Sequence, residues 1–112
     1  MTLFKKIIDK EIPAKIAYED ELCLAFHDVT PQAPTHILMV PKKEIRSMAN
    51  VKEQDKELLG HMLLKCSELA AQLGVAEKGY RLVINTNVWG GQTVFHLHIH
   101  LLAGRSLEWP PG

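Results

Sequence analysis

The sequence predicts an α+β fold built from one short helix, one long helix and several strands. A run near the carboxyl end alternates three histidines with apolar residues, which is typical of a strand that has two different faces. A run in the middle of the chain repeats apolar residues at spacings of three and four, which is typical of an amphipathic helix. Two short runs near the amino end flank a polar turn, which indicates a hairpin.

The first element is expected to be a short helix. Phe4, Ile7 and Ile8 follow helical spacing. Pro13 follows Ile12, and the residue before a proline disfavours the helical conformation. The helix is therefore not expected to continue beyond this point.

A hairpin and a third strand are expected next. The two strands of the hairpin are predicted at residues 16–19 and 22–27, joined by the polar turn Asp20-Glu21. Residues 28–34 contain two prolines and show no periodicity, so they are expected to form a loop. The third strand is predicted at residues 36–40, immediately before a proline.

The long helix is predicted at about residues 51–73. Asn50 is expected to cap its first turn, with Glu53 three residues further on, and Gly74 is expected to close its last turn in the left-handed conformation. The apolar positions of its buried face recur at helical spacing: Leu59, Met62, Leu63, Cys66, Leu69, Ala70 and Leu73.

The last two strands are expected to form a hairpin with a broad loop. Alternation predicts strands at residues 80–85 and 94–102, and the polar, glycine-containing segment 86–93 joins them.

Size and composition restrict the class of protein. A chain of 112 residues is expected to form one domain, and dimerisation would add useful buried surface. Thirteen basic and thirteen acidic residues leave no net charge, so neither a nucleic-acid partner nor a membrane surface is expected. Cys23 and Cys66 are far apart, and two reduced, buried thiols are expected. With no signal peptide or apolar span recognised, the chain is expected to be cytoplasmic.

Three histidines at alternate positions are the main functional signal. If residues 94–102 form a strand, His96, His98 and His100 share one face and can converge on one small group. A phosphate and a metal ion both fit such a group. His61 lies inside the helical pattern and is expected to be a structural side chain.

Other candidates surround the histidines in the predicted fold. His36 begins the third strand and is able to reach the triad if the two strand ends meet on one side of the sheet. Gly90 and Gly91 suit either a backbone cradle for an anion or an ordinary loop. Asn85 and Thr93 flank this loop and offer an amide and a hydroxyl.

Two further features are ambiguous from the sequence alone. Asp28 is suited either to accept hydrogen bonds from two ribose hydroxyls or to bond its own backbone in a turn. Trp109 lies in a tail stiffened by Pro110 and Pro111, and a tryptophan is expected to dock rather than remain in water.

The histidine run resembles the signature of the histidine-triad (HIT) superfamily, His-x-His-x-His followed by two apolar positions. The similarity extends over residues 1–112 as one HIT domain and is strongest to the Hint branch, the histidine-triad nucleotide-binding proteins. The runs that carry it are Lys6-Ile7-Ile8, Glu11-Ile12-Pro13, Ala25-Phe26-His27-Asp28, Pro31-Gln32-Ala33-Pro34-Thr35-His36, Gly79-Tyr80-Arg81, Gly90-Gly91-Gln92 and Trp109-Pro110-Pro111-Gly112.

This resemblance implies a fold, an assembly and an activity. The fold is a five-stranded antiparallel sheet with one long and one short helix, and a homodimer joins two such sheets. The activity is hydrolysis of purine nucleoside phosphoramidates, through a nucleotidyl-histidine intermediate, to a nucleoside 5′-monophosphate and an amine. No metal or other cofactor is needed for this scheme.

The resemblance also implies a role for each matching residue. His98 is the nucleophile, and His36, His96 and His100 orient it or contact phosphate and protons. Asp28 corresponds to the ribose position, and Trp109 to a tail that shapes the preference for the leaving group in the partner's site. Near the phosphate are Asn85, Gly91, Gln92 and Thr93, and around the base are Phe4, Ile12, Phe26, His27 and Val29.

Two positions refine the resemblance. Many Hint relatives have serine where Thr93 stands, and the added methyl group is expected to change rate or leaving-group preference while the reaction class is kept. The galactose-1-phosphate uridylyltransferase branch has glutamine in place of the third histidine, so His100 argues against that branch.

Two other functions remain open from the sequence. A zinc-dependent hydrolase would use His36, His96 and His98 as ligands, with water in the fourth position. A nucleotide-binding adaptor would keep the pocket and act through partners without catalysis.

Overall fold

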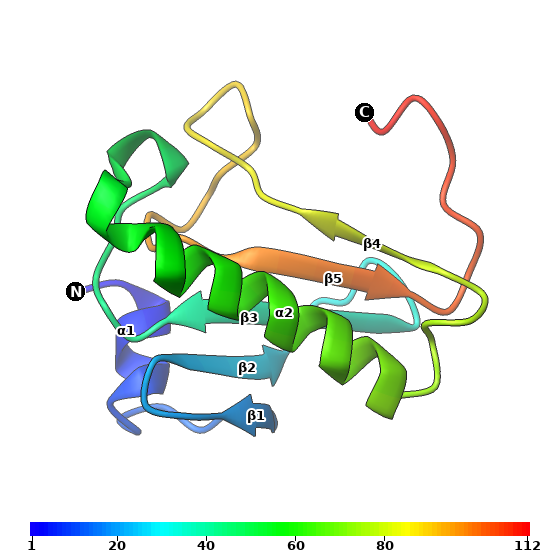
Figure 1. Cartoon of the computed structure of the whole chain (residues 1–112), viewed down its shortest axis with the longest axis horizontal. Helices are drawn as coiled ribbons and strands as arrows, with labels where there is room; N and C mark the ends of the chain where they lie inside the picture. Colours follow the sequence, from blue (N-terminus) through cyan, green and yellow to red (C-terminus); the bar gives the residue numbers. More distant parts are fainter.

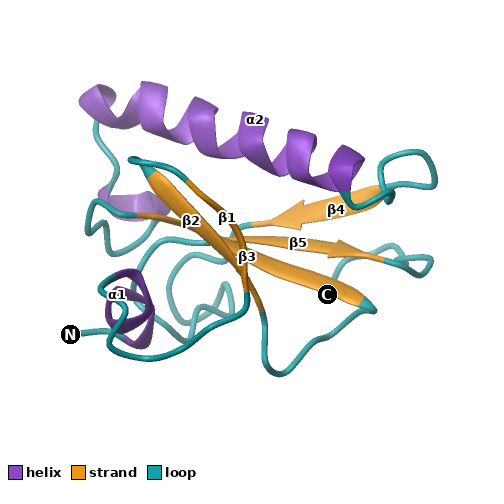
Figure 2. Cartoon of the chain, turned by 90° about the horizontal axis from the view of Figure 1, so that it is seen from below, coloured by secondary structure: helices purple, strands orange, loops and turns teal.

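The computed structural model describes all 112 residues, and its five strands form one antiparallel sheet with a helix on each face (Figures 1 and 2). The helices are α1 (Leu3–Ile8) and α2 (Lys56–Gln72). The strands are β1 (Ile16–Glu19), β2 (Cys23–His27), β3 (Thr35–Pro41), β4 (Tyr80–Val83) and β5 (Ile99–Ala103). The predicted α+β class and the five-stranded antiparallel sheet are confirmed.

The order of the strands brings two distant parts of the chain together. The sheet runs β1-β2-β3-β5-β4, so the last strand in the sequence lies between β3 and β4. In the β3–β5 pair, His36 is opposite Leu102, and Leu38 is opposite His100. Two imidazoles separated by 64 positions therefore reach the same region of the sheet.

Alternation along the strands divides the apolar core between the two faces of the sheet. On one face, residues such as Ile37, Met39 and Ile99 pack beneath α2, against Met62 and Cys66. The opposite face packs against α1 through a second cluster: Phe4, Ile7, Leu24, Phe26, Leu38 and Val40. His36 and His100 alternate with the residues under α2, so they belong to the α1 face.

The last strand begins later in the sequence than the alternation of residues 94–102 predicted. β5 begins at Ile99, and residues 94–98 lie outside the ladder. The backbone N–H of Leu97 donates to Ile45 O at 2.7 Å, and Gln92 Nε2 donates to Val94 O at 3.1 Å. These main-chain groups bond to loop residues instead of strands, although the apolar alternation continues through them. β4 likewise ends at Val83 instead of residue 85.

The long helix begins five residues later than expected. Two short 3₁₀ turns, Met48–Asn50 and Glu53–Asp55, precede α2. Asn50 does not cap the helix, because its Oδ1 accepts from the Ser47 hydroxyl. Asp55 Oδ2 accepts instead from the backbone N–H of Lys52 at 2.9 Å. At the other end, Gly74 has φ of +75° and closes the helix as predicted.

Several surface and core features bear on function. Cys23 and Cys66 are free and buried, as expected. Trp109 is 81% exposed, so the expected docking of its ring does not occur within this chain, although Arg81 Nη2 holds the tail by donating to Glu108 O. Trp89, in the loop between β4 and β5, is fully exposed. No helix combines the length and apolar character that crossing a membrane would need.

Candidate active site

A cavity of about 390 Å³ opens where α1 and the following loop meet the sheet. Most of the residues predicted to contact base, ribose or phosphate line it: Phe4, Ile12, Phe26, His27, Asp28, Val29, Thr93, His98 and His100. The remaining wall comes from Leu3, Ile7, Pro13, Ala14, Thr30, Leu38 and Val94. These residues were missed because no pattern in the sequence distinguishes an apolar cavity wall from core.

His98 is held in a defined tautomer. Its Nδ1 lies 2.7 Å from the backbone carbonyl oxygen of His96. A carbonyl only accepts hydrogen bonds, so Nδ1 carries the hydrogen and the Nε2 of the neutral ring keeps its lone pair. The ring is buried, with 5% of the residue exposed, but it lines the cavity. This arrangement suits a nucleophile.

Aromatic contacts fix the plane of the His98 ring. The Phe4 ring lies edge to face against it, with centroids 4.9 Å apart, and Phe4 also packs edge to face on Phe26 at 5.4 Å. Both phenylalanines belong to the cluster under α1, so the helix that closes the core also restrains the imidazole. The same rings give the cavity an apolar wall suited to a flat base.

His36 and His100 form a hydrogen-bonded pair beside His98. The backbone N–H of Gln32 donates to His36 Nδ1 at 3.0 Å, so the hydrogen of the neutral ring is on Nε2. His36 Nε2 then donates to His100 Nδ1 at 2.9 Å. His100 consequently carries its hydrogen on Nε2, which is buried and has no hydrogen-bond partner. Its ring centroid is 4.9 Å from that of His98.

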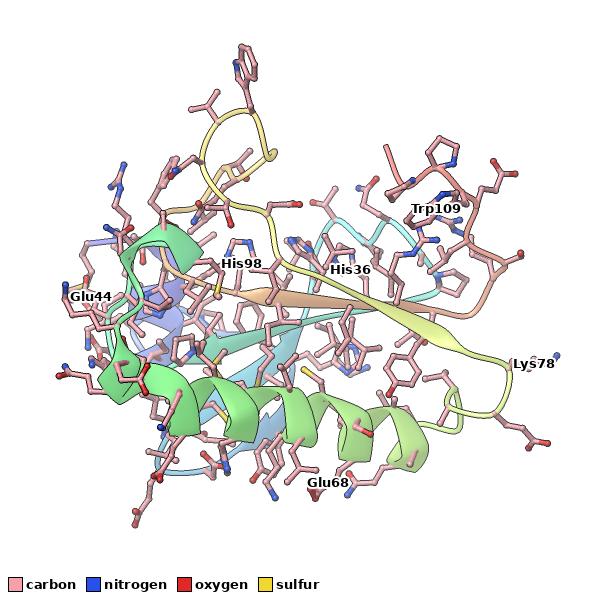
Figure 3. All side chains as sticks on the ribbon, turned by 45° about the horizontal axis from the view of Figure 1, so that its top comes forward. His36, Glu44, Glu68, Lys78, His98 and Trp109 are labelled. Atoms are coloured by element: carbon pink, nitrogen blue, oxygen red, sulfur yellow. The ribbon has the colours of Figure 1, made fainter.

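Asp28 adjoins this pair. Its Oδ1 accepts from the backbone N–H of Thr30 at 2.8 Å, which is the hydrogen bond within a turn that the sequence suggested as one alternative. Its Oδ2 lies 3.5 Å from His36 Nε2 and remains at the cavity wall. The turn holds the carboxylate in place while its second oxygen is left for other partners. Figure 3 shows His36 and His98 on the same side of the sheet, away from α2.

Burial keeps the three site imidazoles neutral. It lowers the pKa of His98 below the usual value for histidine, and the hydrogen bond to the His96 carbonyl, which favours the charged ring, only partly opposes this effect. Burial and the adjacent His98 and His36 lower the pKa of His100 to about 4. Burial also lowers the pKa of His36, and Asp28 only partly opposes this effect. At neutral pH these rings therefore act as lone-pair donors and N–H donors, not as cations.

His96 plays a different part from the other two histidines of the run. It is fully buried, and its Nε2 lies 2.8 Å from the carbonyl oxygen of Pro41. The ring therefore ties the segment before β5 to the end of β3, and its Nδ1 has no partner. His96 does not line the cavity; its backbone carbonyl orients His98.

Gln92 holds the loop that precedes the histidine run. Its Oε1 accepts from the N–H of Asn87 at 2.8 Å, and its Nε2 donates to the carbonyls of Arg46 and Val94. This buried side chain does not line the cavity. A phosphate contact by Gln92 is thus not seen, since its amide is occupied by the backbone.

The neighbouring loop residues differ in position. Thr93 lines the cavity, whereas Asn85, Gly91 and the distant Trp109 do not. Gly91 adopts φ of +86°, and a Cβ on Gly90 would lie 2.3 Å from Thr86 O. Both glycines are therefore required by the shape of the loop itself, which supports the interpretation of this pair as part of an ordinary loop.

One set of potential metal ligands occurs at the site. Ligand atoms of Asp28, His36 and His100 lie within 4.8 Å of one another. This set differs from the expected zinc ligands, because the ligand atoms of His36, His96 and His98 do not form such a group. The described geometry therefore moves any metal alternative to Asp28, His36 and His100.

Comparison with known proteins gives a consistent result. A model of the HIT domain matches residues 9–107. An uncharacterised HIT-like protein of Synechococcus elongatus is 61% identical over 111 residues, which span 99% of this chain and 96% of that protein. The crystal structure of a HIT family hydrolase from Legionella pneumophila has a TM-score of 0.98 at 51% identity, with 100% of both chains covered.

A more distant structure carries a more specific description. A histidine triad nucleotide-binding protein from Candida albicans has a TM-score of 0.83 at 27% identity, covering 98% of this chain and 83% of that one. The domain match, the relatives in sequence and the agreement in structure, together with the geometry of His36, His98 and His100, lead to one conclusion: the chain belongs to the HIT domain family.

Proposed function

We propose that this protein hydrolyses purine nucleoside phosphoramidates through a nucleotidyl intermediate on His98, releasing a nucleoside 5′-monophosphate and an amine. The observation that carries the proposal is the bond from His98 Nδ1 to the His96 carbonyl, because it leaves a lone pair on Nε2 at the wall of a cavity. The hydrolase and nucleotide-binding descriptions of the relatives support the same reaction class.

In the first step, the lone pair of His98 Nε2 forms a bond to phosphorus while the P–N bond to the amine breaks. The electron pair of that bond leaves with the amine, which must also gain a proton. The phosphorylated ring is cationic, and its Nδ1–H remains bonded to the His96 carbonyl, which stabilises the charge. The nucleophile is competent at neutral pH because its pKa is lowered.

In the second step, water attacks phosphorus and the bond to Nε2 breaks, so the electron pair returns to the ring. The product is a nucleoside monophosphate, and His98 is restored. His100 supports both steps. The hydrogen bond from His36 to His100 Nδ1 places the His100 hydrogen on Nε2, where it is free to donate to a phosphoryl oxygen. Thr93 offers a hydroxyl at the same cavity that is able to pass a proton to the leaving amine in the first step and to take one from the attacking water in the second.

The shape of the cavity supports a nucleotide as the substrate. Its lining combines apolar side chains, among them Phe4, Ile12 and Phe26, with imidazoles that include those of His98 and His100. We assign the apolar part to the purine base and the free oxygen of Asp28 to the ribose hydroxyls. The imidazoles then lie with the phosphate.

We also propose that the protein is a homodimer. β4 is an edge strand of the sheet, and an edge strand has unpaired backbone groups that pair readily with another chain. The tail with the exposed Trp109 is tied to this same strand through Arg81. We assign the tail to the partner's site, where it would contact the leaving group. Sedimentation of the full chain tests the dimer directly.

The deciding experiment traps the intermediate. Mass spectrometry during turnover of a fluorogenic adenosine phosphoramidate is expected to find a nucleotidyl group on the peptide that contains His98. Turnover without an adduct on His98, or an adduct on another histidine, contradicts the proposed mechanism. Tight binding of adenosine monophosphate with no turnover of any phosphoramidate would favour the adaptor instead.

A metal hydrolase is the second candidate, favoured by the donor set Asp28, His36 and His100. The two mechanisms differ in their response to a chelator. Dialysis against a chelator should leave covalent catalysis by His98 unchanged, whereas a zinc hydrolase would lose turnover and regain it with added zinc.

A further inference from the structure

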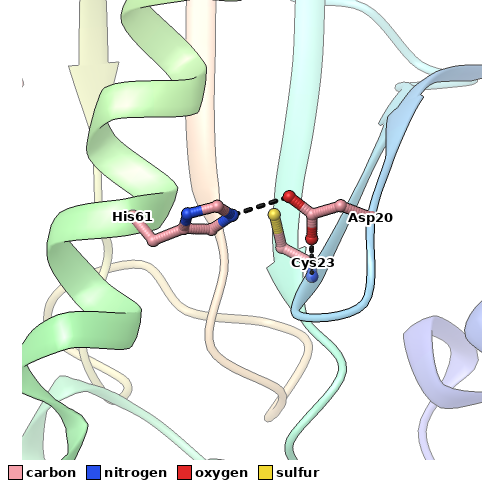
Figure 4. A group of neighbouring side chains, drawn as sticks. All are labelled: Asp20, Cys23 and His61. Carbon is pink, nitrogen blue, oxygen red and sulfur yellow. Dashed lines mark hydrogen bonds and ion pairs between the residues drawn. The ribbon is translucent and has the colours of Figure 1, made fainter.

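A second cluster of ligand-type side chains lies between α2 and the β1–β2 hairpin (Figure 4), on the face of the sheet that α2 covers. Asp20 belongs to the turn between β1 and β2, Cys23 is the first residue of β2, and His61 projects from α2. One ligand atom from each of the three residues lies within 4.8 Å of the other two. The candidate mechanism uses none of them.

We propose that Asp20, Cys23 and His61 bind a zinc ion. The site is independent of the proposed phosphoramidate hydrolysis. It would connect the β1–β2 turn to the long helix and act as a structural clamp. The three donors come from the β1–β2 hairpin and from α2, which the core already holds together, so little ordering is needed when the ion binds.

Asp20 is oriented as a ligand by its own turn. Its Oδ1 accepts from the backbone N–H groups of Leu22 and Cys23 at 2.8 and 2.9 Å. This arrangement directs Oδ2 toward His61, whose Nε2 is 2.6 Å away. The hydroxyl of Tyr18 donates to the same Oδ2 at 2.6 Å and would remain as an outer partner of the ligating carboxylate.

The charges of the cluster balance with a divalent ion. Burial alone would raise the pKa of Asp20, but hydrogen bonds from Tyr18, His61 and the turn lower it well below its usual range, so the carboxylate is ionised. Burial, followed by the charge of Asp20, raises the pKa of the Cys23 thiol to about 12. Zinc would displace the thiol proton, and its two charges would offset the carboxylate and the thiolate.

The geometry requires a small rearrangement. In a tetrahedral zinc site, oxygen and nitrogen ligands at about 2.0–2.1 Å from the metal are about 3.3 Å apart. The Asp20 and His61 atoms are closer than that, at 2.6 Å, because a hydrogen bond now joins them. Zinc would replace that bond, with the His61 hydrogen moving from Nε2 to Nδ1. The side chains of His61 and Asp20 are 26% and 23% exposed, so solvent has access to the fourth position.

The donor types select zinc among common divalent ions. One thiolate, one imidazole and one carboxylate suit a borderline metal, whereas calcium and magnesium prefer sites made of oxygen ligands alone. Cobalt(II) binds the same donor types, and its thiolate complexes absorb in the near ultraviolet. Cobalt is therefore a probe that separates this cluster from the histidines of the cavity, which offer no sulfur.

The test titrates the reduced full chain with cobalt(II) alone. We expect a thiolate-to-cobalt band that saturates at one ion per chain and disappears when zinc is added. Cys23→Ser should abolish the band, while the matched control Cys66→Ser, which changes the other buried cysteine, should keep it. His61→Gln should weaken cobalt binding at least about tenfold. Zinc should also raise the Tm of the wild-type chain and of Cys66→Ser only.

Circular dichroism checks that each variant is folded, and His61→Gln carries the test if Cys23→Ser is not. Absence of the band in the wild-type chain overturns the proposal, as does a band that survives Cys23→Ser or is lost in Cys66→Ser. The first of these outcomes would leave the three residues as a clamp without an ion, and the other two would place the bound ion at a different thiol. Because the readout is spectroscopic and needs no turnover, its result does not depend on whether the phosphoramidase activity is found.

Discussion

His36 Nε2 and His100 Nδ1 lie 2.9 Å apart, and the bond between them sets which nitrogen of His100 carries its hydrogen. His36 is the donor in this bond, because the backbone N–H of Gln32 donates to His36 Nδ1 and so leaves the hydrogen of the ring on Nε2. His36 therefore positions the donor on His100, although it does not line the cavity itself.

Removing the donor at position 36 should lower kcat. We expect His36→Phe to reduce kcat about 10- to 100-fold with little change in KM, because the His100 hydrogen is then free to move to Nδ1. His36→Asn, whose amide can still donate, should recover part of the loss. Steady-state kinetics on a phosphoramidate measures both variants. A change confined to KM would contradict the positioning role.

Removing the nucleophile should separate binding from chemistry. We expect His98→Ala to lower kcat by at least about a thousandfold, because no other lone pair is held at the same place. Its affinity for adenosine monophosphate should change little, as measured by calorimetry. Turnover equal to that of the wild-type chain would exclude covalent catalysis by His98.

The pH profile should follow the protonation of His98. The nucleophile must be neutral, and burial lowers its pKa below the usual 6.5. We therefore expect log kcat/KM to be level from neutral pH down to below 6.5 and to fall only under more acidic conditions. A fall that begins above pH 6.5 would mean that the nucleophile has a normal or raised pKa.

Acid should destabilise the folded chain through the same imidazoles. In the unfolded chain histidine titrates near 6.5, but in the folded chain the pKa of His100 is about 4. Between these values the unfolded state binds more protons, so the free energy of unfolding falls as the pH is lowered from 6.5 to 4. The loss due to His100 is about 3 kcal/mol at most. Urea unfolding should show a smaller fall in His100→Gln, and an equal fall would argue against this origin.

Gln92 distinguishes a structural role from a phosphate contact. We expect Gln92→Ala to reduce the free energy of unfolding by about 2 kcal/mol, because it removes the hydrogen-bond partners of three backbone groups. Gln72→Ala, at the exposed end of α2, is the matched control and should change stability by less than about 0.5 kcal/mol. Urea unfolding measures both. Unchanged stability together with a raised KM in Gln92→Ala would restore the phosphate role that the resemblance implied.

The strands that rest on local alternation could be predicted from the sequence, but their ends could not. The apolar alternation of residues 94–102 continues into a segment whose backbone bonds to Ile45 and to the Gln92 side chain. A ladder needs a neighbouring strand, and that neighbour is a property of the whole fold. The predicted start of α2 was wrong for a similar reason. The Ser47 hydroxyl donates to the Asn50 side chain, which therefore does not cap the helix.

The candidate site was predictable to the extent that its residues are close in the sequence. His98 and His100 lie in one extended run, and their rings do lie together. The place of His36 depends on the β3–β5 register, which joins residues far apart in the chain. Periodicity gives no information on that register. The clamp from Asp20 to His61 depends on tertiary packing in the same way, and the sequence predicted only that His61 is structural.

The exposure of Trp89 and Trp109 has a practical consequence for spectroscopy. They are the two tryptophans of the chain, with exposures of 103% and 81%. Both indoles contact water in the folded chain, so the wavelength of their emission maximum should change little when the chain unfolds. A shift toward the blue would instead report that something has covered the loop or the tail, which makes the native fluorescence of this protein a sensor of association.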